Sequence, residues 1–432
     1  MRRIPMAGLA AGLALALAAC GGGGSGSKTT AQPKSGELSG RGPITFVTGK
    51  DLSGNVQKQV DTWNSQHPTE QARIIELPED ADSQRQQMVQ NAQTKSDAYT
   101  ILNLDVVWTD EFAANRWVAE IPKSQIDLSK FLAPTVSTGQ YRDKLYAVPS
   151  ASDGGLLYYR KDLLDKVGIK AAPKTWAEMF AACDKLKAVP EAKGAGCYAG
   201  QFDKYEGLTV NASEAIGGAG GSVVDASGKP TVNTPQAKQG LDFLANGFKK
   251  GYIPKEALTY KEEEGRRAFQ AGKLIFQRQW PYQYALAEKT DGSSKVAGKF
   301  AVAPLPGLTG PGASTLGGHD LAISAFAKNQ ATALDFIKYI TGEEAQKANL
   351  LATSQAPTVA SLYDDPALVK KFPYLPTLKA SILNAKARPL VVKYNDVTTA
   401  IQEAAYSVIT GKQTSDQALT ELQTKLGTLI QP

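Results

Sequence analysis

The sequence contains few of the residues that build catalytic or metal centres. Only two of its 432 residues are histidines, His67 and His319, which excludes a multi-histidine zinc site. No Gly-x-Ser-x-Gly motif is present, and Lys273, although preceded by Ala-Gly, lacks the following Ser or Thr of a phosphate loop. The glycine cluster at 217–221 does not have the dinucleotide-binding spacing. These absences argue against hydrolase, kinase and dehydrogenase functions, and we expect neither a cofactor nor a bound metal.

Apolar runs are short, and the stretch from Met6 to Leu17 cannot span roughly 30 Å of hydrocarbon. It follows a basic start, Met1-Arg2-Arg3, and ends at Leu17-Ala-Ala-Cys20, which is typical of a lipoprotein signal. We therefore predict that residues 1–19 are removed and that Cys20 carries acyl chains, which place the protein on the outer face of the cytoplasmic membrane. The alternative is an ordinary signal peptide that ends in a chance cysteine.

Only three cysteines occur, so Cys183 and Cys197 remain as one pair once Cys20 is lipidated. An oxidising compartment favours a disulfide, which would close a loop of about 15 residues and contribute about 3 kcal/mol. The alternative is a buried free thiol, because Cys183 shares the apolar face of a predicted helix with Met179 and Leu186.

Charge of one sign is not concentrated anywhere in the chain. The formal net charge is +6, but Lys and Arg are interleaved with Asp and Glu. This pattern gives no indication of nucleic-acid binding.

Large apolar residues are almost absent from Gly21 to Arg41, so residues 20–41 are predicted to be a flexible tether. Beyond Pro43 the pattern alternates between strands, at 44–48, 72–77 and 99–104, and helices, which include one at 83–94. A second such region begins with a strand at 155–159. Alternating strands and helices predict right-handed βαβ units and an α/β fold whose sheets are covered on both faces.

Three capping boxes mark predicted helix starts. Thr175 with Glu178, Thr341 with Glu344 and Thr414 with Gln417 have the spacing of this motif. Gly411 is predicted to end a helix over 397–410, whose apolar face contains Val397, Ile401 and Val408.

Carboxylates, amides and aromatic residues follow several predicted strands. Asp51 and Asp105 come after strands, Gln84 lies in the first turn of a helix, and Asp153 lies at the passage to the second region. Open α/β sheets bind ligands at the carboxyl ends of their strands. Planar polar groups that bridge hydroxyls, together with aromatic rings that cover a C–H face, suit a sugar.

Each of these residues also has a simpler explanation. The aspartates could be helix caps or surface residues, Trp108 and Trp280 could belong to the core, and Arg388 could be a surface cation.

Nine segments together resemble a known family, the extracellular solute-binding lipoproteins (family 1) of carbohydrate ABC importers. These segments are 105–113, 146–149, 156–162, 173–178, 205–211, 269–273, 280–282, 305–307 and 317–319. Residues 205–211 and Arg388-Pro389 are most similar to trehalose- and maltose-binding members.

The resemblance implies a two-lobed, type II periplasmic-binding-protein-like fold with the ligand between the lobes. Lobe one would comprise 42–151 and 307–378, and lobe two 152–306 and 379–432, with hinge crossovers near Ala151, Leu305 and Thr377. It also implies a monomer that is not an enzyme, that binds an oligosaccharide such as trehalose or maltose, and that delivers it to ABC permease subunits.

By the same resemblance, ligand contacts are expected at a set of residues from both lobes: Asp51, Gln84, Asp105, Asp153, Glu206, Trp280, Tyr282, Gly318 and Arg388. The chain departs from the family pattern at Lys50-Asp51 and at His319. The rival hypothesis is a secreted glycoside hydrolase, which would use paired carboxylates such as Asp153 and Glu206.

Overall fold

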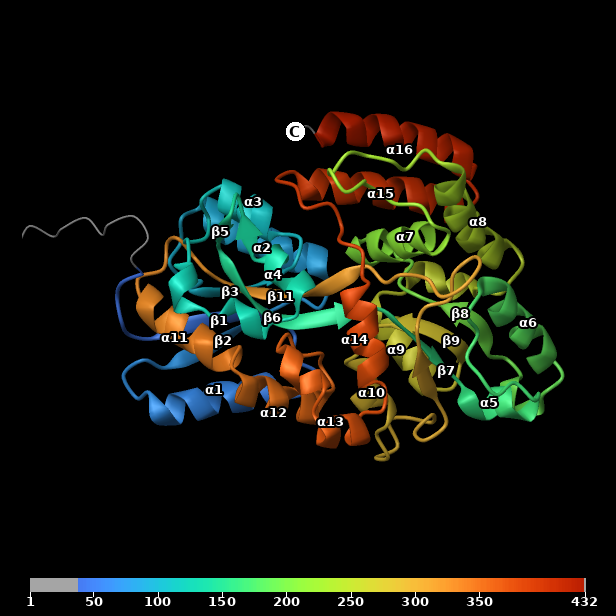
Figure 1. Cartoon of the computed structure of the whole chain (residues 1–432), viewed down its shortest axis with the longest axis horizontal. Coiled ribbons are helices and arrows are strands. Elements are labelled where there is room, and N and C mark those ends of the chain that lie inside the picture. The colour runs from blue at the N-terminus through green and yellow to red at the C-terminus, as the bar shows by residue number, and fades with distance from the viewer. Residues whose placement is uncertain (1–37, 431–432) are drawn as a thin grey trace, which may run out of the picture. The chain divides into compact units, whose positions relative to one another are not determined.

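A five-stranded mixed sheet organises one half of the molecule, on the left of Figure 1, which is called the first half below although it also contains later parts of the chain. The structure, a computed structural model, describes residues 38–430. The predicted signal segment and Cys20 lie outside these residues. The strand order is β2-β1-β3-β11-β6, with β1 parallel to β2 and β3, and β11 antiparallel to β3 and β6. The strands are β1 (Ile44–Gly49), β2 (Ala72–Leu77), β3 (Ile101–Asp105), β6 (Ala147–Gly154) and β11 (Leu316–Ile323).

Both faces of this sheet are covered, as the alternating pattern predicted. On β1, Ile44 and Phe46 pack into one apolar cluster while Val47 packs into another. The helices of this half are α1 (Asn55–Gln66), α2 (Ala81–Gln93), α3 (Thr109–Ala114), α4 (Ala133–Thr138), α11 (Gln330–Ile340), α12 (Glu343–Thr353), α13 (Pro366–Lys371) and α14 (Leu375–Leu383). A short hairpin joins β4 (Gln140–Tyr141) and β5 (Lys144–Leu145).

A four-stranded sheet with the order β10-β7-β9-β8 organises the second half, on the right of Figure 1. Its strands are β7 (Leu156–Tyr159), β8 (Gly196–Ala199), β9 (Leu274–Gln279) and β10 (Ala301–Ala303). Its helices are α5 (Lys161–Lys166), α6 (Trp176–Leu186), α7 (Glu206–Gly218), α8 (Pro235–Lys249), α9 (Glu262–Gln270), α10 (Gln283–Ala287), α15 (Tyr394–Ile409) and α16 (Ser415–Leu429). Every residue of β9 is buried, so this strand lies at the centre of the second core.

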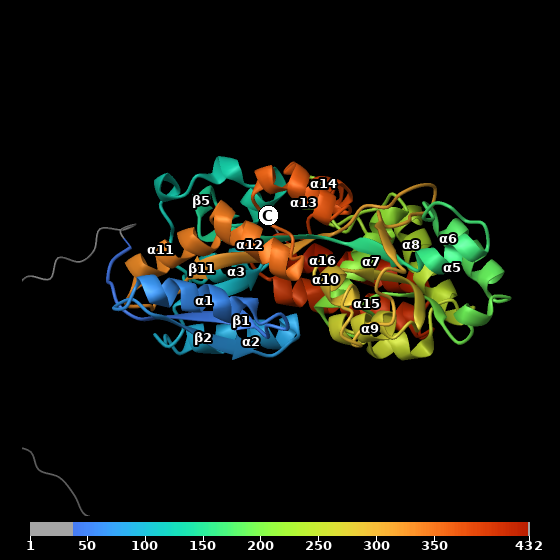
Figure 2. The ribbon, with the colours of Figure 1, turned by 90° about the horizontal axis from the view of Figure 1, so that it is seen from below.

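The chain passes between the two sheets at three places, which can be followed by colour in Figures 1 and 2. The first two passages lie between β6 and β7 and between β10 and β11. The third was expected near Thr377, but Thr377 lies inside α14, which packs on β6 and α4. The chain reaches the second half only at α15, which packs on α7 and α8. Arg388 therefore lies within the third passage.

Local signals at the helix ends were mostly read correctly. Thr175 and Thr414 form the predicted capping boxes of α6 and α16. Thr341 does not start a helix: it is the C-cap residue of α11, and its hydroxyl donates to the Ile337 carbonyl. Gly342 is the N-cap residue of α12, so Thr341 and Glu344 have the spacing of a capping box, but Thr341 lies one residue before the N-cap position.

Residues Ser39 to Arg41, expected to end the tether, contact the first half instead. The Ser39 carbonyl accepts from the Gln330 amide at the start of α11. Arg41 pairs with Glu70 and Asp335 at 3.1 and 2.8 Å. The prediction of a tether was based on the lack of large apolar residues in this segment, and that criterion does not detect polar contacts.

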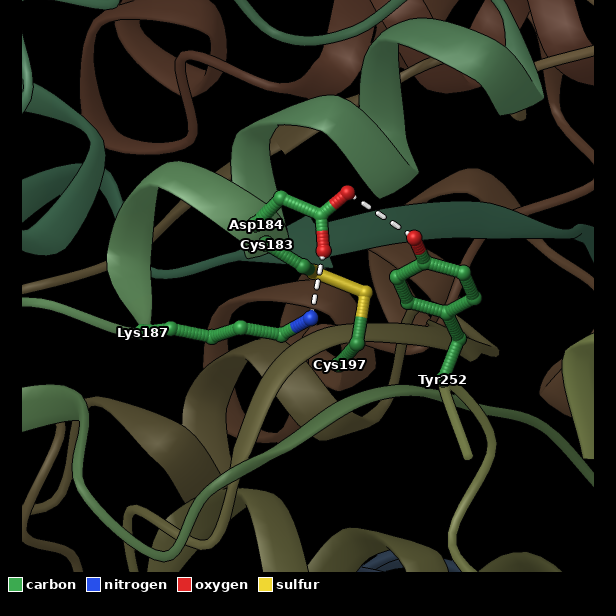
Figure 3. Close-up of a disulfide and its surroundings, with 5 residues drawn as sticks. All are labelled: Cys183, Asp184, Lys187, Cys197 and Tyr252. Carbon is green, nitrogen blue, oxygen red and sulfur yellow. Dashed lines mark hydrogen bonds and ion pairs between the residues drawn. A yellow bond between two sulfur atoms is a disulfide. The ribbon is translucent and has the colours of Figure 1, made fainter. Parts of the chain in front are cut away.

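A disulfide joins Cys183 on α6 to Cys197 on β8, with Cα atoms 5.7 Å apart (Figure 3). Both residues are buried in the second core. Beside them, Asp184 accepts from the Tyr252 hydroxyl at 2.8 Å and pairs with Lys187. The crosslink therefore ties α6 to the sheet within one half of the molecule.

Among residues 38–430, no helix is long and apolar enough to cross a membrane.

Candidate functional site

A cavity of about 800 Å³ is lined by residues from both halves of the molecule. Side chains from the ends of β1 and β3 line it together with residues of α7, α9, α12 and the segment after β9. The lining includes every residue for which a ligand contact was expected: Asp51, Gln84, Asp105, Asp153, Glu206, Trp280, Tyr282, Gly318 and Arg388. The structure thus brings together side chains that are up to hundreds of positions apart in the sequence.

Asp51 and Gln84 both hold local backbone. The Asp51 carboxylate accepts from the Ser53 and Val56 amides at 2.8 Å each, so it holds the turn before α1 and one amide of the first helical turn, although Gly54 is the N-cap residue. The Gln84 amide nitrogen donates to the Pro78 and Glu79 carbonyls at 2.9 and 3.1 Å. Both residues also line the cavity, so each stabilises the local backbone and presents a polar side chain to the cavity.

Arg388 joins two of the expected carboxylates and is not a surface cation. Its side chain is 1% exposed, and it pairs with Glu206 at 2.6 Å and with Asp105 at 2.7 Å. Asp105 comes from the end of β3 and Glu206 from the start of α7. The guanidinium therefore ties the first sheet to the helices of the second through the third passage of the chain.

Glu206 is held by groups on α15 as well. Thr398 donates to one carboxylate oxygen at 2.6 Å, and the Tyr394 hydroxyl donates to the other. Burial raises the pKa of Glu206 to about 7, against the opposing effect of Arg388. The sequence offered no signal for these partners, which lie almost two hundred residues away.

Asp153 differs from Glu206 because no described residue forms a hydrogen bond with its carboxylate. It lies on β6 opposite Gly317 and faces the cavity. Burial raises its pKa to about 7, although the Arg278 guanidinium acts in the opposite direction. Its oxygens are available to an incoming hydroxyl.

Two aromatic residues follow β9. Trp280 is partly exposed to the cavity, while Tyr282 donates from its hydroxyl to Glu263 at 2.8 Å. The edge of the Trp280 ring lies against Gly317, where an added Cβ would be 2.8 Å from the indole. Trp108 is only 2% exposed and packs into the apolar cluster of Val47, so it belongs to the core, although it also contributes to the cavity lining.

Gly318 has a φ of 122°, and a Cβ there would be 2.2 Å from the Ala151 carbonyl oxygen. Only glycine allows β11 to pass β6 so closely at this point. His319, where the chain departs from the family pattern, also lines the cavity, and burial lowers its pKa. Lys50, the other departure, pairs with Glu79 at 3.0 Å at the edge of the cavity.

Other lining residues were not predicted, notably Asn103, Glu263, Asn349 and Gln355. Asn103 lies within β3, where its period-two position could have indicated it, whereas Asn349 and Gln355 belong to a helix and a loop without a distinguishing pattern. Among the described residues, no group of three or more His, Cys, Asp or Glu side chains could hold a metal ion.

Comparison with known proteins identifies the class. The model of the family described as bacterial extracellular solute-binding protein matches residues 49–347. A probable ABC transporter-binding protein of Deinococcus radiodurans is 37% identical over 382 residues, which cover 86% of this chain and 89% of that protein. A mannitol-binding protein of Pseudomonas aeruginosa is 24% identical over 404 residues, 88% of this chain and 91% of the relative.

Among solved structures, the maltose-bound MalE3 of T. maritima matches with a TM-score of 0.84 and 32% identity. The match covers 90% of this chain and 100% of that one.

The chain therefore belongs to the bacterial extracellular solute-binding proteins, as the resemblance implied, and it has their two-lobed fold. It is a binding protein and not an enzyme, so the glycoside hydrolase hypothesis is set aside.

Proposed function

We propose that this protein captures a short oligosaccharide, an α-glucoside disaccharide such as trehalose or maltose, and delivers it to the permease subunits of an ABC importer. The observation that carries the proposal is the mixed lining of the cavity, to which carboxylates, amides, an arginine and the ring of Trp280 all contribute. Polar groups of this kind bridge vicinal hydroxyls, and an aromatic ring covers the C–H face of a pyranose. The maltose-bound relative of similar fold supports the choice of sugar class.

The lobes and the anchor belong to the same proposal. We assign residues 42–154 and 316–383 to lobe one and residues 155–315 and 384–432 to lobe two. These bounds differ from those implied by the resemblance because β6 extends to Gly154, the loop that contains Gly307 bonds to α6 and α7, and α14 packs on β6. The monomer would be tethered outside the cytoplasmic membrane through lipids on Cys20. Closure of the lobes around the sugar would present the joined surface to the permease.

Calorimetric titration and thermal unfolding with trehalose, maltose, longer glucans and mannitol test the proposal. A sugar present at about 100 times its Kd stabilises the protein by about 2.7 kcal/mol, so at least one α-glucoside should raise the melting temperature clearly. Trp280→Ala is the matched variant and should abolish most of the shift. A protein stabilised only by mannitol would contradict the choice of α-glucosides, and one stabilised by no saccharide would contradict the proposal as a whole.

A further inference from the structure

The residue beneath the Trp280 ring is a buried arginine that does not itself reach the cavity. The guanidinium carbon of Arg278 lies 3.6 Å from the centroid of the indole ring. The Arg278 side chain is 1% exposed and does not line the cavity, whereas Trp280 does. Any influence of Arg278 on a ligand must therefore act through the ring.

Arg278 is held in one orientation because each nitrogen of its guanidinium group donates to a polar partner. Its Nε and Nη2 atoms both donate to Glu214 on α7 at 2.7 Å, which is a bidentate pair. Its Nη1 atom donates to Gln201 at 3.2 Å. A planar guanidinium fixed in this way presents a flat face to the indole, which a lysine ammonium cannot do.

The partner Glu214 is in turn fixed by the second passage of the chain between the sheets. The Thr315 amide donates to Glu214 at 3.1 Å, and the Ser314 hydroxyl lies within 3.2 Å of the same oxygen. Gly155, in the first passage, has no room for a Cβ, which would lie 2.6 Å from the Glu214 carboxylate and 2.8 Å from Arg278. The ion pair therefore lies directly against two of the three segments that connect the sheets.

Together these contacts immobilise the Trp280 ring. Arg278 covers one face and Gly317 meets one edge, so the opposite face is the one offered to the cavity. We infer that Arg278 is a positioning residue of the binding site, which sets the orientation of the Trp280 platform and thereby the affinity for the pyranose stacked on it. The statement about affinity rests on the proposed function, while the statement about the ring does not.

The fixed orientation of the Trp280 ring can be tested without any ligand. The contribution of Trp280 to the near-ultraviolet circular dichroism is obtained by subtracting the spectrum of Trp280→Phe. In Arg278→Lys, which keeps the charge but not the plane, this contribution should fall by at least half because the ring becomes mobile. An unchanged contribution would overturn the inference. Glu214→Gln, which keeps the shape of the partner, is the second variant if Arg278→Lys does not fold.

The effect of Arg278 on affinity is tested by a double-mutant cycle, with the saccharide of the panel above that binds most tightly. Arg278→Lys should weaken binding about tenfold in the wild-type background and have no further effect in Trp280→Ala, because the two residues act as one unit. Tenfold losses in both backgrounds, or wild-type affinity in Arg278→Lys, would overturn the inference.

Arg160→Lys is the matched control. Arg160 also pairs with a carboxylate through two nitrogens, on Asp162 at 2.8 and 2.6 Å, and its side chain is 10% exposed. It does not line the cavity, and it makes no cation–π contact among residues 38–430. It should change neither the spectrum nor the affinity. If no saccharide binds the wild-type protein, the proposed function fails, while the spectrum still decides the position of the ring.

Discussion

Arg278 and Arg388 are both buried and both neutralised by carboxylates, yet they occupy different positions relative to the cavity. Arg278 pairs with one glutamate through two nitrogens and lies behind an aromatic ring. Arg388 pairs with two carboxylates from different halves of the molecule and lines the cavity, and its Nε has no hydrogen-bond partner among residues 38–430. Arg278, whose three nitrogens all have partners, orients its neighbours, whereas Arg388 keeps one buried donor without a partner among residues 38–430.

The largest expected effect is a difference in the free energy of unfolding between variants of the two arginines. Arg278→Met leaves Glu214 buried without its cation and should lower the free energy of unfolding by about 3–5 kcal/mol. Arg388→Met should cost less near pH 6, because Glu206, with its pKa of about 7, can take up a proton while it keeps its contacts with Tyr394 and Thr398.

Urea unfolding at pH 6 and pH 8 measures this difference. The loss in Arg388→Met should grow toward pH 8, where Glu206 must carry its charge without a cation. Equal losses for the two variants at both pH values would show that the two ion pairs are energetically alike.

Asp320 extends the comparison to a buried carboxylate without any cation. Its buried side-chain oxygens form no hydrogen bond of good geometry among the described residues, and burial raises its pKa to about 7, against the opposing effect of the nearby Thr138 hydroxyl. The folded protein therefore binds more protons than the unfolded chain between about pH 4 and pH 7, so stability contributed by this group is lost as the pH rises through that range.

The variant Asp320→Asn should remove this loss. We expect it to be more stable than the wild type at pH 8 by about 2–4 kcal/mol and to lose the advantage at acidic pH. Guanidinium unfolding from pH 4 to pH 8 gives the two slopes. Parallel curves would mean that Asp320 finds a partner in solution.

Reduction of Cys183–Cys197 tests a covalent tie in the second half of the molecule. It should lower the free energy of unfolding by about 3 kcal/mol, because the crosslink restricts the unfolded chain. Affinity for sugar should not change, since the bond connects α6 to β8 and does not contact the cavity. Cys183→Ser with Cys197→Ser serves as the control, and two reactive thiols in the unfolded, unreduced protein would contradict the disulfide.

The smallest expected effect compares the cavity carboxylates. Asp153→Ala should reduce sugar affinity by about 1.5–3 kcal/mol without lowering the stability of the free protein, because no hydrogen bond of the Asp153 carboxylate is lost among the described residues. Since burial raises the pKa of Asp153 to about 7, the variant should be more stable than the wild type at pH 8 and lose this advantage at acidic pH. Glu206→Ala should lower both, since Arg388, Tyr394 and Thr398 lose their acceptor. Calorimetry with parallel melting curves separates the two, and an unaltered affinity in Asp153→Ala would remove that residue from the site.

The sequence predicted the residues of the cavity better than the contacts that hold those residues in place. The carboxyl ends of β1 and β3 place Asp51 and Asp105 at one edge of a sheet whatever the details of packing, so strand periodicity and family resemblance were enough to find them. Thr341 and the end of the tether were misread because each depends on a competing contact, with the Ile337 carbonyl and with α11 respectively.

The sequence by itself determined the alternation of strands and helices and most helix caps, because these follow from local periodicity and spacing, while its resemblance to a known family indicated the residues that meet in the cavity. Only the tertiary structure decided that Glu206 is bound by α15, that Arg388 joins both halves, and that Arg278 lies beneath Trp280. Such partners are distant in the chain, and their pairing depends on the burial and packing of whole elements, which no local pattern encodes.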